Sequence, residues 1–196
     1  MRTDVLISLS NRHVHLSREA LDKLFGEDYE LTISRMVGAK EYASTDTVTV
    51  SGPKGSISRV RVLGPERDYT QVELLRGDSF KLGVTAPLCD SGHIDNAAVL
   101  TLTGPKGTYL CTCGIVARRH IHLGEPVAHE YSIKEGDTVS VRITGERGLV
   151  FDNVIVRHGR SNACKMHIDT EEGNAAGIGN GTIGEIVAVN TVEEGE

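Results

Sequence analysis

RHVHL, residues 12–16, recurs as RHIHL, residues 119–123, in a chain of 196 residues. In an extended strand, side chains at positions i and i+2 lie on the same face. Each copy therefore predicts a strand that presents two imidazoles on one face and aliphatic side chains on the other. Imidazole is the commonest protein ligand for transition metals, zinc included. Two matching copies predict a protein with two metal sites.

Short alternating segments make up most of the remaining sequence. A period near two, typical of strands, is found in residues 47–50, 59–62, 99–102 and 139–143. Three Gly-X-X-Gly segments, residues 52–55, 104–107 and 145–148, separate such runs. A strand follows each of them, so they predict the turns of three β-hairpins. A phosphate-binding role for these turns is disfavoured, because no helix N-terminus follows them.

Two short helices are predicted, each just after a His-X-His strand. Ser17 is a suitable N-cap for a helix over residues 18–25, whose apolar stripe ends before Gly26. Residues 125–131 form the second candidate, with Pro126 in the first turn. The repeat therefore consists of a His-bearing strand, a helix and hairpins. It predicts two related β-rich halves, and barrels are favoured because closure removes exposed strand edges.

Composition restricts the class of protein. Hydrophobic residues make up 39% of the chain and aromatic residues only 4%, with no Trp, which predicts an aliphatic core. The formal charge of −6 argues against nucleic acid as a partner, because phosphate backbones require a basic face. No segment has the length and apolarity of a membrane span, and the start lacks a signal-peptide pattern. We therefore expect a soluble intracellular protein, and a small anionic ligand stays open if a few cations gather in a cleft.

The four cysteines do not have the pattern of a disulfide framework. Cys111 and Cys113 lie two residues apart without a second pair at zinc-ribbon spacing, and we interpret them, like Cys89, as ordinary packing residues. A reducing compartment fits this usage. The sequence also contains no Ser-His-Asp or Cys-His signature of an acyl-enzyme mechanism.

Each histidine pair needs at least one further ligand, because a catalytic zinc site has three protein ligands and an open position. His167 lies in another alternating segment and is the best candidate for the second pair. Glu73 is a candidate for the first pair, although its pattern equally fits a solvated strand residue. Arg67 lies in a polar loop, where arginines commonly serve solubility, but its planar fork also suits bidentate phosphate binding. The weaker histidine candidates are His93, His129 and His158.

The sequence resembles the PduL-type phosphate acyltransferases over about residues 5–189. The motifs that carry the resemblance are NRHVHLS (11–17), the two Gly-Pro-Lys-Gly turns, VLGPER (62–67), QVE (71–73), KLG (81–83), AP (86–87), ARRHIHL (117–123) and HIDTEEGNAA (167–176). The resemblance implies reversible transfer of a short acyl group, propanoyl or acetyl, between coenzyme A and phosphate. It also implies a mostly β fold of two small β-barrel domains capped by short α-helices, with the active site between them. The implied domains are residues 12–117 and residues 118–196 with the strand 1–11 added, whereas the pattern alone places the boundary near Gly107.

The resemblance further implies a set of site residues. His13, His15 and Glu73 are the expected ligands of one zinc ion, and His120, His122 and His167 are those of a second. Arg67 is the expected catalytic and phosphate-binding residue, and the coenzyme A contacts are not assigned. Direct attack of phosphate on the thioester is favoured over an acyl-enzyme.

The resemblance also implies partners and a location. The expected small-molecule partners are acyl-CoA, phosphate and acyl phosphate. The expected protein partners are a second copy of the chain in a homodimer, and microcompartment shell or cargo enzymes of propanediol degradation. Neither nucleic acid nor membrane is expected. The expected location is the cytoplasm or the lumen of a bacterial microcompartment, with no N-terminal encapsulation extension visible. The chain departs from the family at Cys89 and in residues 91–95, which leaves the acyl-chain preference open.

Three alternatives stay open. His13-X-His15 followed by Glu19 has the spacing of a cupin metal site, although the predicted helix turns Glu19 away. A hydrolase could use the same metal ions to activate water on a thioester, without any need for phosphate. A zinc-stabilised scaffold protein of microcompartment shells is the third, and it would close its metal coordination with protein ligands.

Overall fold

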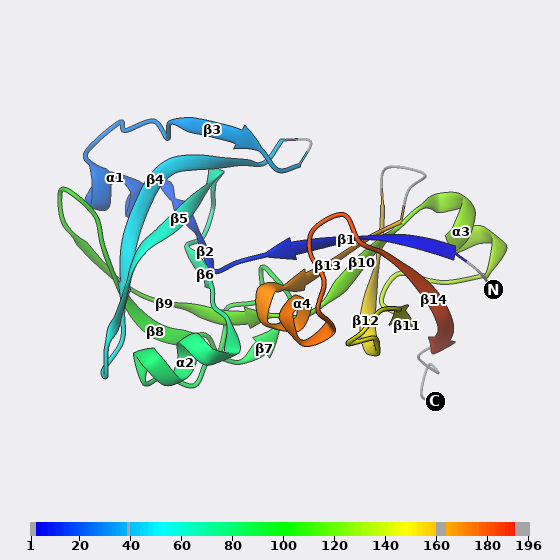
Figure 1. The fold of residues 1–196 in the computed structure, drawn as a ribbon. Helices are drawn as coiled ribbons and strands as arrows, with labels where there is room; N and C mark the ends of the chain where they lie inside the picture. Colours follow the sequence, from blue (N-terminus) through cyan, green and yellow to red (C-terminus); the bar gives the residue numbers. More distant parts are fainter. Residues whose placement is uncertain (1–2, 39, 160–163, 191–196) are drawn as a thin grey trace, which may run out of the picture. The chain divides into compact units, whose positions relative to one another are not determined.

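The computed structural model describes residues 3–38, 40–159 and 164–190. The chain forms two compact units: unit 1 comprises residues 1–10 and 118–196, and unit 2 comprises residues 11–117. Figure 1 shows the strands and helices of each unit. None of the helices in the described residues has the length and apolarity needed to cross a membrane.

Unit 1 is a closed barrel of six strands in the order β1-β13-β10-β12-β11-β14. β1 pairs with the last two strands of the described residues, parallel to β13 and antiparallel to β14. The elements of unit 1 are β1 (Thr3–Ser10), β10 (His120–Leu123), α3 (Glu125–Glu130), β11 (Thr138–Ile143), β12 (Leu149–His158), β13 (Lys165–Asp169), α4 (Thr170–Ala176) and β14 (Ile183–Asn190).

Unit 2 also contains a closed ring of six strands. Its pairs run β4-β5-β2-β6-β9-β8 and return from β8 to β4, while β3 and β7 extend the sheet outside the ring. The elements of unit 2 are β2 (His13–Ser17), α1 (Arg18–Phe25), β3 (Ile33–Met36), β4 (Tyr42–Ser51), β5 (Ser56–Arg67), β6 (Gln71–Glu73), α2 (Arg76–Leu82), β7 (Leu88–Cys89), β8 (Ala98–Thr103) and β9 (Thr108–Ala117). The prediction of two small barrels with short helices is confirmed.

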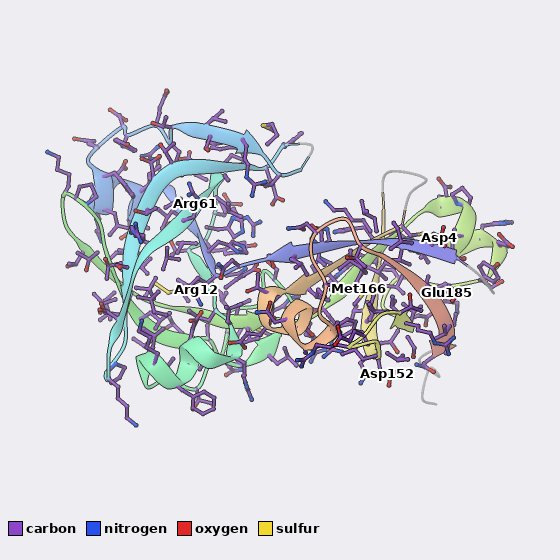
Figure 2. The ribbon with its side chains drawn as sticks, viewed as in Figure 1. Asp4, Arg12, Arg61, Asp152, Met166 and Glu185 are labelled. Atoms are coloured by element: carbon purple, nitrogen blue, oxygen red, sulfur yellow. A yellow bond between two sulfur atoms is a disulfide. The ribbon has the colours of Figure 1, made fainter. Side chains whose placement is uncertain are left out.

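Each barrel has its own aliphatic core. Val14, Val62 and Leu102 are fully buried in unit 2, and Val5 and Met166 are fully buried in unit 1. Figure 2 labels Met166 within unit 1. Along β8 of unit 2 and β13 of unit 1, buried residues alternate with more exposed ones, which is the pattern of a strand with one face on a core.

The two predicted helices are present. The hydroxyl of Ser17 accepts a hydrogen bond from the N–H of Ala20 and caps α1, and the N–H of Gly26 ends it by donating to the carbonyl oxygen of Asp22. α3 begins at Glu125 with Pro126 in its first turn. The three predicted hairpins are also confirmed, because residues on both sides of each glycine turn are paired.

The two Gly-Pro-Lys-Gly turns of unit 2 cap helices that lie far away in sequence. The N–H of Lys106 donates to the carbonyl oxygen of Leu24 in α1 at 2.9 Å, and the N–H of Lys54 donates to that of Leu82 in α2 at 3.0 Å. Each turn thus satisfies one of the carbonyl groups that a helix end leaves without a partner. At Gly104 a Cβ atom would collide with the carbonyl oxygen of Leu24, so the close approach requires glycine there.

Candidate metal centres

The first histidine pair meets Glu73 across two antiparallel strands. In the register of β2 and β6, His13 lies opposite Glu73 and His15 lies opposite Gln71. One potential ligand atom from each of His13, His15 and Glu73 lies within 4.8 Å of the others. We call this group the His13 site. It brings together all three residues expected at the first metal.

The second pair is built in the same way in unit 1. In the register of β10 and β13, His120 lies opposite His167 and His122 lies opposite Lys165. The ligand atoms of His120, His122 and His167 also lie within 4.8 Å of one another, and we call this group the His120 site. The rings of His120 and His167 are stacked with centroids 5.1 Å apart. Glu73 and His167 therefore occupy equivalent positions of the two units.

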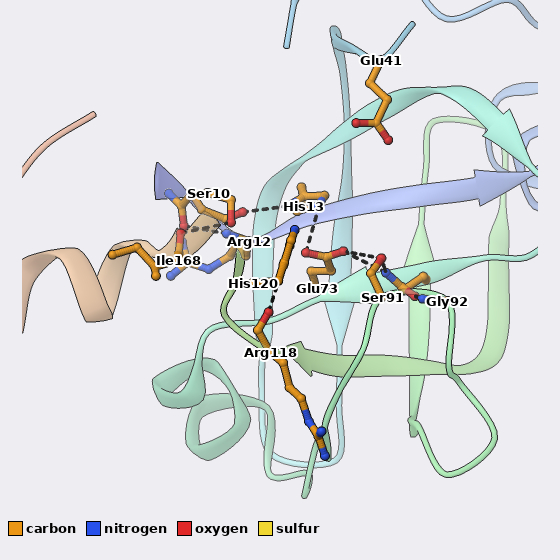
Figure 3. A network of polar contacts seen from close by, with 12 residues as sticks. Ser10, Arg12, His13, Glu41, Glu73, Ser91, Gly92, Arg118, His120 and Ile168 are labelled. Atoms are coloured by element: carbon orange, nitrogen blue, oxygen red, sulfur yellow. Dashed lines mark hydrogen bonds and ion pairs between the residues drawn. The ribbon is translucent and has the colours of Figure 1, made fainter. Parts of the chain in front are cut away.

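The first histidine of each pair is oriented by a main-chain carbonyl two residues before it. His13 Nδ1 lies 2.8 Å from the oxygen of Asn11. His120 Nδ1 lies 3.1 Å from the oxygen of Arg118 (Figure 3). A carbonyl can only accept, so each Nδ1 carries the proton and donates it. This leaves Nε2 of each ring as the atom available to a metal, and it is the arrangement that orients many metal-binding histidines.

Burial and charge keep the His13 site ready to bind a cation. His13 and His15 are buried, and Oε2 of Glu73 lies 3.4 Å from Nε2 of His13. Burial acts to raise the pKa of Glu73, but the charges of His13 and His15 and the hydrogen bonds from His13 and Ser91 together outweigh it and lower the pKa to about 2. Burial, together with the charges of His13 and Arg67, lowers the pKa of His15 to about 3. At neutral pH the site therefore holds an ionised carboxylate and a neutral imidazole.

The His120 site is more open. The ring of His122 is exposed, and those of His120 and His167 are half-buried. Partial burial lowers the pKa of His122, and the neighbouring charges of His120, Lys165 and Arg157 act in the same direction. This imidazole is therefore also held in the neutral form that binds metals.

The donor sets of both sites fit zinc. Three histidines, or two histidines and a carboxylate, are the ligand sets of zinc sites that keep an open coordination position. Nδ1 of His15 is buried and has no hydrogen-bond partner within the described part of the chain. A buried polar atom in that condition is rare in native proteins and is accounted for when a bound ion or water completes the site.

Arg67 was predicted in a loop, and this was wrong: it is the last residue of β5. The strand continues through Pro65 because β5 pairs with β2 as far as Ser17 and Arg67. Arg67 Nη2 donates to Oε1 of Glu41 at 2.8 Å, and Nη1 donates to the hydroxyl of Tyr69 at 3.2 Å. The guanidinium is therefore held in place by groups on two sides.

The arginine that opens each pentapeptide has a structural partner that sequence reasoning missed. Arg12 Nε donates to Oδ2 of buried Asp78 at 2.6 Å, and that oxygen also accepts the N–H of Leu75 at the start of α2. In unit 1, Arg119 Nε lies 2.8 Å from Oε1 of Glu172, whose other oxygen accepts the N–H of Asp169 at the start of α4. In both units the arginine thus joins the start of its histidine strand to the first turn of a helix in the same unit.

The prediction that Cys111 and Cys113 are ordinary packing residues was wrong, because the two are joined by a disulfide. Opposite β8, Ala98 pairs with Gly114 and Val99 with Thr112, so Cys113 is the extra residue of a β-bulge. The bulge brings the two Cα atoms to 5.4 Å, within the range that a disulfide spans. The uneven register between the strands could not be seen in the sequence of β9.

The remaining candidates lie outside the two sites. Glu19, the third ligand of a cupin pattern, lies in α1 and pairs with Lys23 at 2.6 Å. Within the described residues, His93, His129 and His158 belong to neither ligand group. Gln71 and Ser91, which sequence reasoning did not single out, contact the carboxylate of Glu73.

Comparison with known proteins gives one consistent result. A sequence model of the phosphate propanoyltransferase family matches residues 6–179. A phosphate propanoyltransferase of Thermotoga maritima is 45% identical over 93% of this chain and 89% of its own length. The phosphate propanoyltransferase of Rhodopseudomonas palustris is 47% identical over 87% of this chain and 76% of its own length. That of Rhodobacter capsulatus is 47% identical over 90% of this chain and 83% of its own length. The matched residues include both ligand groups and Arg67.

Proposed function

Because the chain belongs to the phosphate propanoyltransferase family, a family of acyltransferases, we propose that it interconverts a short-chain acyl-CoA and phosphate with the acyl phosphate and coenzyme A. Propanoyl-CoA and acetyl-CoA are the proposed acyl donors. The observation that carries the proposal is the family match over residues 6–179, within which lie two groups of potential metal ligands and a half-buried arginine.

The proposed reaction is a direct transfer. A phosphate oxygen forms a bond to the carbonyl carbon of the thioester, the carbon–sulfur bond breaks, and its electron pair leaves with the sulfur of coenzyme A. We propose Arg67 as the residue that binds phosphate. Its Nη2 already contacts the carboxylate of Glu41, and the planar guanidinium fork is suited to bidentate binding of phosphate. Its positive charge offsets the negative charge that phosphate brings to the thioester.

We propose that His13, His15 and Glu73 hold one zinc ion, and that His120, His122 and His167 hold another. When bound, zinc supplies Lewis-acid charge for a departing thiolate or a developing oxyanion. The protein prepares the sites beforehand: the carbonyls of Asn11 and Arg118 fix two of the imidazole rings. The lowered pKa values of Glu73 and His15 keep those two ligands in the form that binds a cation.

We further propose that residues 12–117 and residues 118–196 with 1–11 act as the two domains of the enzyme. The division into two compact units supports this proposal. A homodimer, located in the cytoplasm or in the lumen of a bacterial microcompartment, is the proposed working form.

The test is the release of the coenzyme A thiol from propanoyl-CoA and acetyl-CoA, measured with and without phosphate and before and after chelation. We expect release that requires both phosphate and metal, and the two rates rank the acyl groups. Release without phosphate would instead identify a thioester hydrolase. No release from either thioester by protein with metal bound would contradict the acyltransferase proposal.

A further inference from the structure

We propose that Gln71 and Ser91 are positioning residues that fix the orientation of Glu73 and thereby raise the metal affinity of the His13 site alone. The inference rests on the proposed metal sites, but it is tested by metal binding rather than by acyl transfer. It assigns a role to two side chains that are not themselves in either ligand group.

One oxygen of Glu73 is held by two donors. Gln71 Nε2 donates to Oε1 of Glu73 at 2.9 Å, and the hydroxyl of Ser91 lies 3.0 Å from the same oxygen. The other oxygen, Oε2, faces Nε2 of His13. Figure 3 shows the carboxylate between His13 and Ser91. The two oxygens therefore differ in function. Oε1 accepts the hydrogen bonds that orient the carboxylate, and Oε2 is left as the oxygen available to a metal ion.

The orientation of the Gln71 amide is fixed by its surroundings. Gln71 is fully buried, and its Oε1 accepts the N–H of Gly92 at 2.7 Å. Because a backbone N–H can only donate, the amide oxygen must face Gly92 and the NH₂ group must face Glu73. The same NH₂ group lies 2.8 Å from the hydroxyl of Ser91. Residues 91 and 92 are thus joined to the metal ligand through one buried side chain.

In the described part of unit 1, the His120 site has a lysine at the position that glutamine occupies in the His13 site. By strand register, Lys165 of unit 1 corresponds to Gln71 of unit 2, and His167 corresponds to Glu73. A lysine ammonium has donors only, so it cannot accept a backbone N–H as Gln71 does. The contacts that orient a metal ligand typically change metal affinity by about 10- to 100-fold. The effect should therefore appear at one of the two sites, and the other site is an internal control.

The test is a zinc titration of the full chain against a competing chelator, which resolves two equivalents in the wild type. Ser91→Ala removes one donor to Glu73, and Gln71→Met removes the other at similar volume. We expect affinity losses of about tenfold for Ser91→Ala and up to about 100-fold for Gln71→Met, in one equivalent only. Ser91→Thr keeps the hydroxyl and should restore the affinity.

Ser44→Ala is the matched control for a general loss of stability in unit 2. Ser44 is buried in unit 2, and its hydroxyl donates to the carbonyl oxygen of Val62 rather than to Glu73. This variant should keep both equivalents. With cobalt in place of zinc, the visible spectrum should change in Ser91→Ala and return in Ser91→Thr, which a purely structural role would not cause.

Two results would overturn the inference. One is an unchanged affinity of both equivalents in Gln71→Met, and the other is an equal loss in both equivalents or in Ser44→Ala. A wild-type protein that transfers acyl groups but binds no zinc would remove the basis of this inference and leave the acyltransferase intact. A protein that binds two zinc ions with the expected variant effects but transfers no acyl group would contradict the acyltransferase proposal and leave the role of Gln71 and Ser91 in place.

Discussion

Arg12→Ala is expected to lower the free energy of unfolding of unit 2 by about 2 kcal/mol. The side chain of Asp78 is only 6% exposed, and its Oδ2 depends on Arg12 and on the N–H of Leu75. Removal of the guanidinium leaves this oxygen of a buried carboxylate with the neutral N–H of Leu75 as its partner among the described residues. The variant therefore removes more than a surface ion pair.

The magnitude follows from the burial of the two partners. Loss of one partner of a fully buried ion pair costs about 3–5 kcal/mol, whereas an exposed pair contributes about 0–1 kcal/mol. The side chain of Arg12 is 30% exposed, so water screens part of the interaction, and Asp78 keeps its bond to Leu75. A value of about 2 kcal/mol lies between these limits. For the pair in unit 1, with exposures of 33% and 20%, about 1 kcal/mol is expected for Arg119→Ala.

The assay is urea denaturation of the metal-free protein. Metal that binds only the folded state would itself raise the free energy of unfolding and hide the effect of the substitution. A double-mutant cycle with Arg12→Ala and Asp78→Ala isolates the pair from other effects of each substitution. We expect a coupling energy of about 2 kcal/mol with an unchanged m-value. A coupling energy below about 0.5 kcal/mol would refute the reasoning, because the two side chains would then act independently.

Arg67→Ala should reduce kcat/KM for phosphate by about 100-fold because one charge-assisted contact is lost, and Arg67→Lys should recover part of that loss. Steady-state rates measured at varied phosphate concentration test this prediction. An unchanged kcat/KM would exclude Arg67 as the residue that binds phosphate. Burial acts to lower the pKa of His13, but the charge of Glu73 and the hydrogen bonds to Glu73 and Asn11 outweigh it, so the pKa is raised above 6.5. Zinc must displace that proton to bind His13, so below the raised pKa the Kd for zinc at the His13 site should increase about tenfold for each unit by which the pH falls. A pH-independent Kd in chelator titrations would contradict the assignment of His13 as a zinc ligand. Gly104→Ala should destabilise unit 2 by about 2 kcal/mol or more because its Cβ meets the carbonyl oxygen of Leu24, whereas Gly179→Ala, with nothing within 4 Å of its Cβ, should leave the urea midpoint unchanged.

The local elements could be predicted wherever a pattern was complete within a few residues. The strand after Arg12, the capped helix after Ser17 and the hairpin at residues 52–55 are examples. α2 was not predicted because Leu75 at its N-cap has no side chain that can cap a helix. Instead, the carboxylate of Asp78, three residues later, accepts the N–H of Leu75. α4 was missed although Asp169 and Glu172 form a capping box that the sequence contains.

The composition of the sites depended on pairing between distant strands, which a single sequence does not reveal. Nothing in the pattern around Glu73 distinguishes it from a solvated residue; only the register with His13, 60 positions earlier, places it in the site. The pattern offered Glu73 and Arg67 only as candidates, and the resemblance to a known family assigned them to the site. Gln71 and Ser91 escaped notice for the same reason, because their contacts join a strand to a distant loop.

The pairing of β1 with β13 and β14 has a consequence for the synthesis of the chain. β1 is synthesised well before its partner strands, which begin only at Lys165 and Ile183. At about 5–20 residues per second, β1 waits for on the order of ten seconds or more with both edges unpaired. Unpaired edges invite pairing with other nascent chains. We therefore expect unit 2, whose strands all lie between residues 11 and 117, to fold first, and unit 1 to depend on chaperones until its last strand is made.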